Sequence, residues 1–214
     1  MDNNIKKRFD NASKEYVTEK YIWRYKSAQL VSKLVNPKLN DIILDIGCGT
    51  GKQIIEMSRY IKFGIGIDVS DGMIQQATEN ARFEKSKNVE FFLGTFDKPD
   101  EKINLREMNV TKIISNYALH HLNLKEKKKA IEKMVYMGGQ SLQTIVIGDL
   151  MFFENPNNFK DEYDTIGYGP ESDKPSTVEE LMDCFSDLSF NIEVHKLHPL
   201  VGVLVASIDN KTRH

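Results

Sequence analysis

Cysteine is scarce in this sequence, which has Cys48 and Cys184 among its 214 residues. Two cysteines make neither a disulfide framework nor a thiolate metal centre, so no metal site is expected. Cys48 lies in a glycine-rich turn, where a small side chain suffices. A redox role for its thiol stays open at this point.

Long apolar stretches and a strong net charge are also lacking. No segment matches a membrane-spanning helix of roughly 20 apolar residues. Residues 1–8 lack the apolar part of a signal peptide, so we expect a cytoplasmic protein. The formal net charge of −2 gives no general attraction to nucleic acid. With 40% hydrophobic and 28% charged residues, residues 1–214 are expected to form a single domain.

The most informative segment runs from Ile43 to Gly51 and reads ILDIGCGTG. Its apolar start predicts a strand buried on both faces. Its glycines predict a tight turn into a helix that begins near Lys52. Such a turn brings backbone N–H groups close to a ligand, which indicates a nucleotide-like cofactor.

The glycine spacing narrows the class of cofactor. The G-x-G-x-G pattern differs from the G-x-G-x-x-G of dinucleotide sites. Lys52 is followed by Gln53, whereas a phosphate-binding P-loop needs Ser or Thr there. Asp45 precedes the glycines, where an acid would repel a pyrophosphate and suits a cation or an amino group.

Strand and helix patterns alternate through the first two thirds of the chain. Apolar runs predict strands at 42–44, 65–69, 89–93, 112–116 and 144–147. This alternation predicts an α/β fold, a doubly wound and mostly parallel sheet. Ligands of such sheets bind beyond the carboxyl ends of the strands. The residues expected at those ends are Asp45, Asp68, Gly94, Asn116 and Asp149.

The end of the chain follows a different pattern. Thr177 and Glu180 have the spacing of a helix capping box. Strands are expected over 191–197 and 201–208, and the short turn between them makes the pair antiparallel. The expected divisions are a helical N-terminal cap (1–36), a cofactor-binding core (40–150), a substrate lid (151–175), and a helix with a terminal hairpin (176–208).

The segment from Ile43 to Gly51 resembles the first motif of class I S-adenosylmethionine-dependent methyltransferases. The element order over 40–208 is similar to the same family, and Ser115 to Leu122 resembles the segment after strand four of its small-molecule enzymes. The resemblance implies a Rossmann-like sheet of about seven strands, with an antiparallel C-terminal strand inserted. It also implies S-adenosylmethionine as cofactor, S-adenosylhomocysteine as product, and in-line methyl transfer.

The resemblance also assigns roles to residues. Asp68, which an ordinary helix cap would also explain, is expected to accept the ribose hydroxyls. Thr95 stands where the family usually has an acid facing the adenine, so that contact is weakened. Arg24 is a candidate partner of the cofactor carboxylate. The expected cofactor-binding residues are Asp45, Gly47, Cys48, Gly49, Gly51, Asp68, Val69, Met73, Thr95, Phe96 and Asn116.

The residues expected around the acceptor are less specific. His120 and His121 are candidate catalytic bases, and at most one of two adjacent histidines should face the site. Packing is the alternative for both. Two histidines without further nearby Cys or His do not predict a metal centre. The candidate substrate-binding residues, which include aromatic residues of the lid, are Tyr117, Asp149, Tyr163 and Tyr168.

The partner expected from this pattern is a small-molecule methyl acceptor, bound by a monomer or homodimer. An RNA or protein methyltransferase is the alternative enzyme, but the lysines at 125–129, beside Glu126 and Glu132, have the spacing of a solvated helix face. A non-catalytic S-adenosylmethionine-binding partner subunit is the alternative of another class. The altered Thr95 position leaves that alternative open.

Overall fold

The computed structural model describes residues 22–208. Of the helical cap expected over 1–36, it therefore describes the part from Ile22 onward, where helix α2 begins. The first 21 positions of that expectation lie outside the described residues. Within the described range, no helix is both long enough and apolar enough to cross a membrane.

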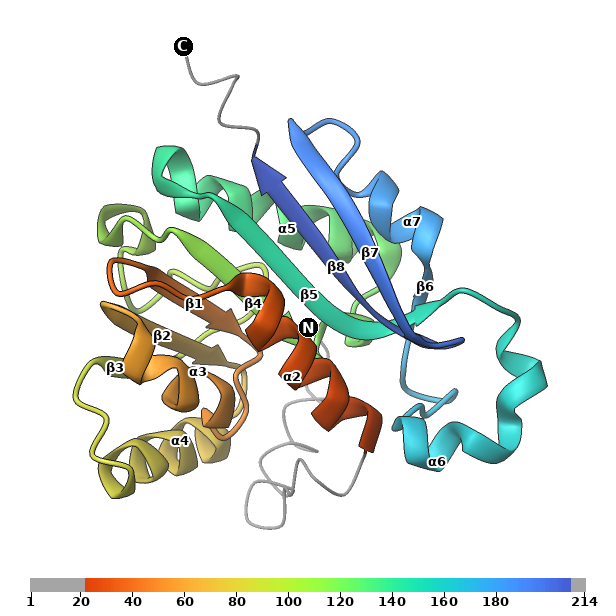
Figure 1. Cartoon of the computed structure of the whole chain (residues 1–214), viewed down its shortest axis with the longest axis horizontal. Helices are drawn as coiled ribbons and strands as arrows, with labels where there is room; N and C mark the ends of the chain where they lie inside the picture. The colour runs from red at the N-terminus through yellow and green to blue at the C-terminus, as the bar shows by residue number, and fades with distance from the viewer. Residues whose placement is uncertain (1–21, 209–214) are drawn as a thin grey trace.

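An eight-stranded sheet organises the described residues (Figure 1). The order of its main path is β3-β2-β1-β4-β5-β8-β7, with β6 paired to β5. The strands are β1 (Ile42–Ile46), β2 (Phe63–Asp68), β3 (Val89–Leu93), β4 (Lys112–Asn116), β5 (Thr144–Phe152), β6 (Ser176–Thr177), β7 (Phe190–His198) and β8 (Val201–Ile208). The first five are mutually parallel, and β8 runs antiparallel to β5 and β7. The expected mostly parallel Rossmann-like sheet is confirmed.

Helices cover both faces of this sheet (Figure 1). The α-helices are α2 (Ile22–Val35), α3 (Lys52–Met57), α4 (Asp71–Phe83), α5 (Leu124–Gly138), α6 (Tyr163–Ile166) and α7 (Val178–Asp183). Short 3-10 turns are η2 (Ser58–Tyr60), η3 (Leu105–Met108), η4 (Leu119–His121), η5 (Gly139–Ser141) and η6 (Pro156–Glu162). Successive side chains of a strand point to opposite faces, so Ile43 packs with α2 and α3 while Leu44 packs with α5.

The sheet has its switch point between β1 and β4. From β1 the order runs to β2 and β3 on one side, and from β4 it runs to β5 on the other. The loops that follow β1 and β4 therefore diverge and leave a crevice at the carboxyl ends of these strands. The glycine turn follows β1 and Asn116 ends β4, so both lie at this crevice.

Strand β5 is longer than the sequence pattern predicts. It continues past Ile147 to Phe152, because β8 pairs with it antiparallel through Asp149↔Gly202 and Leu150↔Val201. The expectation that Asp149 lies at or beyond the strand end is therefore wrong. It lies inside β5 and is 2% exposed.

The segment expected to be a lid is partly regular structure. Residues 151–175 contain the end of β5, η6 and α6, and lead into β6. Their aromatic side chains pack together in a cluster with Trp23 of α2 and Leu200 of the β7–β8 turn. The terminal hairpin is confirmed, with β8 inserted between β5 and β7.

Candidate active site

The glycine turn has a backbone that other residues would strain. Gly47, Gly49 and Gly51 have φ values of +79°, +53° and +74°, in the left-handed region that favours glycine. A Cβ on Gly47 would lie 2.4 Å from the Cβ of Ala118. The turn is anchored to β2, because the N–H groups of Gly47 and Cys48 donate to Ile67 O at 2.8 and 3.0 Å.

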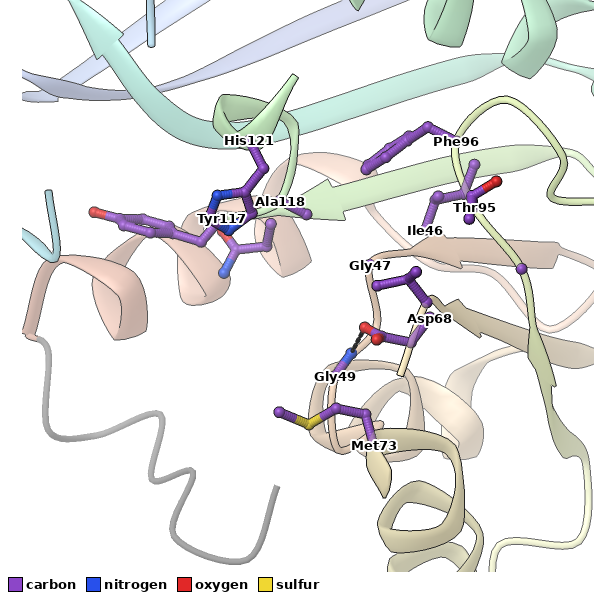
Figure 2. Close-up of a pocket in the computed structure, with 13 residues that line it drawn as sticks. Ile46, Gly47, Gly49, Asp68, Met73, Thr95, Phe96, Tyr117, Ala118 and His121 are labelled. Atoms are coloured by element: carbon purple, nitrogen blue, oxygen red, sulfur yellow. Dashed lines mark hydrogen bonds between the residues drawn. The ribbon is translucent and has the colours of Figure 1, made fainter. Parts of the chain in front are cut away.

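Asp68 ties the glycine turn to the start of α4. Its Oδ2 accepts the N–H of Gly49 at 2.9 Å, and its Oδ1 accepts the N–H of Ser70 at 3.0 Å. Ser70 in turn caps α4 by accepting the N–H of Met73. The carboxylate is thus held rigidly on the wall of the crevice (Figure 2).

The crevice has two lobes. The apolar lobe measures about 540 Å³ with its opening to solvent included, and its walls include Ile46, Val69, Met73 and Phe96 together with Asp68 (Figure 2). The polar lobe lies between α2 and the glycine turn and measures about 1190 Å³ on the same basis. Polar and charged side chains on its wall are Arg24, Gln29, Ser32, Asp45, Lys52, Gln53 and Glu56. Both lobes are bounded by Gly47, Gly49 and Asn116, so they meet at the glycine turn.

Asp45 is the buried acidic residue of the polar lobe. It is 2% exposed, and burial, followed by the charge of Asp68, raises the pKa of its carboxyl from 3.8 to about 8. Burial, followed by the charges of Asp68 and Asp45, raises the pKa of the Cys48 thiol well above its ordinary value. Cys48 is therefore a neutral thiol, which disfavours the redox role left open by the sequence.

Asn116 connects the crevice to α2. Its Oδ1 accepts the Ser27 hydroxyl at 2.7 Å, and its Nδ2 donates to Arg24 O at 3.5 Å. Gln53 of α3 also donates to Ala28 O at 3.1 Å. These bonds fix α2 as one wall of the polar lobe.

Thr95 and Phe96 form the end of the apolar lobe next to β3. The Thr95 hydroxyl donates to Asp97 Oδ1 at 2.7 Å, and this bond, against a smaller effect of burial, lowers the pKa of Asp97. Thr95 therefore presents an oxygen that can accept a further hydrogen bond. Phe96 is 5% exposed and packs against the core as well as the lobe.

Four of the other predicted cofactor positions divide between the lobes and the core. Val69 and Met73 lie on the apolar lobe, and Cys48 lies on the polar lobe. Gly51 faces away from both, because a Cβ there would meet the Phe91 ring at 2.7 Å. Its glycine is required by packing and by the left-handed start of α3.

The two histidines of η4 have different surroundings, as adjacent residues should. His121 lies on the wall of the apolar lobe, beside Tyr117 and Ala118 (Figure 2). His120 is 2% exposed and lies behind that wall. Its Nδ1 contacts Asp149 Oδ1, and its backbone N–H donates to Asp149 Oδ2 at 3.0 Å. Asp149 therefore contacts His120 and is not among the residues that border the two lobes.

The remaining predicted substrate residues lie at different depths. Tyr117 borders the apolar lobe, with φ at +54°, an unusual value for a bulky residue. Tyr163 and Tyr168 contact each other, with ring centroids 4.7 Å apart. They pack in the same cluster as Tyr117 and are not among the residues that border the two lobes.

Sequence reasoning missed two parts of the site. One is the rest of the α2 face, where Ala28 and Ser32 border the polar lobe at four-residue spacing from the predicted Arg24, a helical signal that was available. The other is Asp173, whose carboxylate lies 3.3 Å from His121 Nδ1. No local pattern marks Asp173, because its partner is 52 positions away in the chain.

The stretch from β1 to α5 matches a known protein family. Residues 43–137 match the model of the family described as "Methyltransferase domain". Over these residues the chain is similar to a methyltransferase domain. The matched stretch includes the glycine turn, Asp68 and the η4 histidines, whereas the α2 wall of the crevice lies outside it.

Curated relatives of the methyltransferase domain differ in acceptor. A probable cobalt-precorrin-6B C(15)-methyltransferase (decarboxylating) of Methanococcus maripaludis is 35% identical over 103 residues, which are 47% of this chain and 53% of that protein. A 23S rRNA (uracil(1939)-C(5))-methyltransferase of Marinomonas is 31% identical over 80 residues, 37% of this chain and 18% of that one. The chain spans about half or less of the length of these relatives.

Solved structures share the fold. The magnesium protoporphyrin IX methyltransferase of Synechocystis, crystallised with bound S-adenosylhomocysteine, superposes with a TM-score of 0.65. The match covers 87% of this chain and 83% of that one at 16% identity. The similarity extends beyond residues 43–137 and supports the same architecture for the remainder of the described chain.

Proposed function

We propose that this protein transfers a methyl group from S-adenosylmethionine to a small-molecule acceptor. The observation that carries the proposal is the division of the crevice at the glycine turn. S-adenosylmethionine has a flat, largely apolar base at one end and a charged amino acid at the other. An apolar lobe of about 540 Å³ joined to a polar one matches this asymmetry.

The nucleoside end fits the residues of the apolar lobe. Val69, Met73 and Phe96 provide apolar surface for the base, and the Thr95 oxygen can accept its amino group. Asp68 would accept the ribose hydroxyls. Its carboxylate is already oriented by Gly49 and Ser70, so little ordering is needed on binding.

The amino-acid end fits the polar lobe. Asp45 is buried, and burial together with the charge of Asp68 disfavours its ionised form, so a cationic ligand would stabilise its carboxylate. Arg24 and Lys52 border the same lobe, and their positive charges would attract the carboxylate of the ligand. The pattern of one buried acid and two cations matches an amino acid rather than a phosphate.

When bound, S-adenosylmethionine supplies a sulfonium methyl that is displaced in line by a nucleophile. The chain has to align the acceptor and exclude water. Tyr117 and His121 border the lobe near its junction with the polar lobe, so they are the residues that would contact the acceptor. Direct proton abstraction from the acceptor by His121 stays a prediction. His120 does not border the lobe, so it would affect the reaction only through the residues that it contacts.

The helix of lysines favours a small acceptor over nucleic acid. Lys127 is 2% exposed and donates to Lys174 O and to Ser176 Oγ. Lys128 pairs with Asp187 at 2.7 Å. These two cations are engaged within the protein, so α5 does not offer a free basic stripe for a phosphate backbone.

The test is transfer of tritium from methyl-labelled S-adenosylmethionine. The full chain is incubated with separate pools of amines, hydroxylated aromatics, carboxylic acids and thiols, and with total RNA. We expect label in one small-molecule pool and none in RNA. Label in RNA alone would support the alternative enzyme, and cofactor binding without transfer to any pool would support the non-catalytic subunit.

A further inference from the structure

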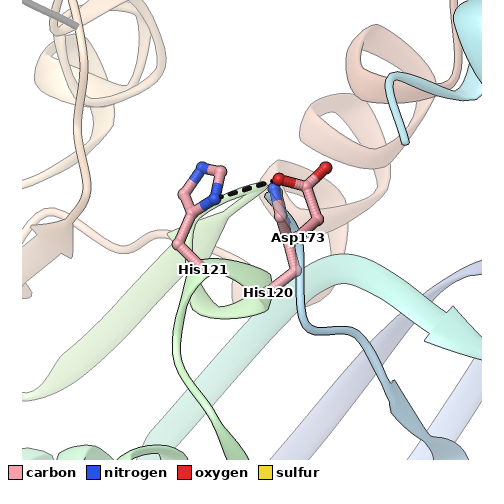
Figure 3. Close-up of side chains that lie close together, drawn as sticks. All are labelled: His120, His121 and Asp173. Atoms are coloured by element: carbon pink, nitrogen blue, oxygen red, sulfur yellow. Dashed lines mark ion pairs between the residues drawn. The ribbon is translucent and has the colours of Figure 1, made fainter. Parts of the chain in front are cut away.

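A compact cluster of potential metal ligands lies beside the apolar lobe. His120, His121 and Asp173 each offer one ligand atom, and these atoms lie within 4.8 Å of one another. Figure 3 shows both imidazoles directed toward the Asp173 carboxylate. The three residues are 2%, 7% and 8% exposed, respectively. Such burial separates this cluster from the exposed acidic groups that are common on protein surfaces.

Asp149 orients His120 as metal-binding histidines are usually oriented. It contacts His120 Nδ1, so the ring presents Nε2 as its lone-pair nitrogen. Ligating histidines generally donate their other ring N–H to a carboxylate in this way, which fixes the tautomer and raises the basicity of the ligand. Asp149 is held in place by the N–H of Leu150, which donates to it at 2.7 Å.

His121 and Asp173 already have the separation of two ligands. Zn–N and Zn–O bonds of about 2.0–2.2 Å at a tetrahedral angle place ligand atoms about 3.4 Å apart. His121 Nδ1 and Asp173 Oδ1 are 3.3 Å apart. The ligand atom of His120 lies within 4.8 Å of the other two.

The backbone holds Asp173 against η4. Lys174 N–H donates to His120 O at 2.6 Å, and Gly169 N–H donates to Asp173 Oδ2 at 2.7 Å. Lys127 binds the carbonyl of Lys174 and the hydroxyl of Ser176. The carboxylate is therefore positioned by several bonds before any ion binds, as a preorganised site requires.

We propose that His120, His121 and Asp173 bind one divalent transition-metal ion, of the Zn²⁺, Co²⁺ or Fe²⁺ type. Two imidazoles and one carboxylate suit these ions better than Mg²⁺ or Ca²⁺, which prefer oxygen ligands alone. Three protein ligands leave coordination positions open. Since His121 borders the apolar lobe, an open position would face the acceptor and could bind its oxygen, nitrogen or sulfur.

The test uses metal alone and does not depend on methyl transfer. The full chain, without an affinity tag and stripped with a chelator, is titrated with Co²⁺ and with Zn²⁺ by calorimetry and visible absorption. We expect one ion per chain with a micromolar or lower Kd. His121→Asn and Asp173→Asn should each weaken binding at least 100-fold, and Asp149→Asn should weaken it about 10- to 100-fold.

A surface histidine provides the matched control. His195→Asn changes a ring whose nearest acid, Glu193, is exposed, and it should leave the metal affinity unchanged. Binding of S-adenosylhomocysteine to the same samples reports separately on the proposed function and on folding. Absence of stoichiometric Co²⁺ and Zn²⁺ binding by the unmodified chain would overturn the metal site. So would binding that survives both ligand substitutions.

Discussion

Asp45 and Asp68 end neighbouring strands of the sheet, yet their carboxylates have different partners. Asp68 accepts two backbone N–H groups. Asp45 is fully surrounded by protein and faces the charge of Asp68, so its pKa rises to about 8. In the ligand-free protein at neutral pH, Asp45 therefore carries a proton for most of the time.

This difference makes stability depend on pH. The pKa of Asp45 is raised above 3.8 by folding, so its contribution to stability is complete below about pH 4 and is lost as the pH rises through about 8. Asp45→Asn removes this loss. We expect the variant to have a higher free energy of unfolding than the unmodified protein at pH 8.5, by about 1 kcal/mol or more, and the difference should be smaller at pH 5. Thermal denaturation across this range measures it.

The same substitution should weaken binding of S-adenosylmethionine. The charged groups facing Asp45 are Asp68 across the glycine turn and Arg24, Lys52 and Glu56 around the polar lobe. A cationic ligand favours ionised Asp45, so affinity should rise from pH 6 to pH 8 as a proton is released. Calorimetry in two buffers of different ionisation enthalpy detects that proton. Asp100→Asn, near α5 and remote from the lobes, is the control. Identical pH profiles for Asp45→Asn and the control would contradict this role.

Gly47 is the residue of the turn least able to accept a side chain. Gly47→Ala combines a φ of +79° with a Cβ 2.4 Å from that of Ala118. Left-handed backbone alone costs about 1–2 kcal/mol, and the clash would displace η4. We expect loss of both stability and cofactor affinity, the latter at least 10-fold. Gly139→Ala has positive φ in open space, so it should lower the melting temperature and leave the affinity intact.

Residues with a local signal were predictable, and residues without one were not. Gly47 directly follows β1 and Asp68 is the last residue of β2, so both could be placed at the crevice from the sequence. Asp173 could not, because its contact with His121 depends on how residues 169–177 fold back over η4. The burial of Tyr163 and Tyr168 likewise depends on packing against α2 and the β7–β8 turn, which no local pattern encodes.

Among the elements, α2 has the most direct influence on the polar lobe. It is joined to β4 by the bond from Ser27 to Asn116 and to α3 by the bond from Gln53 to Ala28. Ser27 is fully buried, so its hydroxyl has no water to replace this partner. The position of Arg24 over the lobe depends on these bonds.

Ser27→Ala tests this dependence. It leaves the Asn116 oxygen without its donor, at a cost of about 1–3 kcal/mol. We expect a lower melting temperature and a 3- to 10-fold weaker affinity for S-adenosylmethionine. Ser32→Ala removes a hydroxyl from the same helix that is only half-buried, and it should have a smaller effect on both. Equal effects of the two substitutions would show that the Ser27–Asn116 bond does not position α2.

The strand boundaries illustrate what periodicity can determine. The bounds of β3 and β4 follow from their apolar runs, because each run is flanked by polar residues or a turn. For β5, Gly148 and Asp149 interrupt the apolar run, although the strand continues beside β8. Pairing with a strand that lies more than 50 positions later overrides the local signal.

At the scale of the whole molecule, the order of the sheet determines where a ligand binds. The switch point between β1 and β4 places the glycine turn opposite Asn116, and α2 and η4 close the two sides. This arrangement was predictable, since strand alternation and the glycine motif imply it. The division into two lobes was not, because it arises from side chains contributed by α2, α3, α4 and η4 together.

The central claim is that both lobes bind one S-adenosylmethionine molecule. Calorimetric titration with S-adenosylhomocysteine and with 5′-methylthioadenosine, which lacks the amino-acid end, tests it most directly. We predict 1:1 binding of both, with S-adenosylhomocysteine at least 10-fold tighter. Asp45→Asn should reduce that advantage without changing the affinity for 5′-methylthioadenosine. Failure to bind S-adenosylhomocysteine, or equal affinities for the two compounds, would contradict the account.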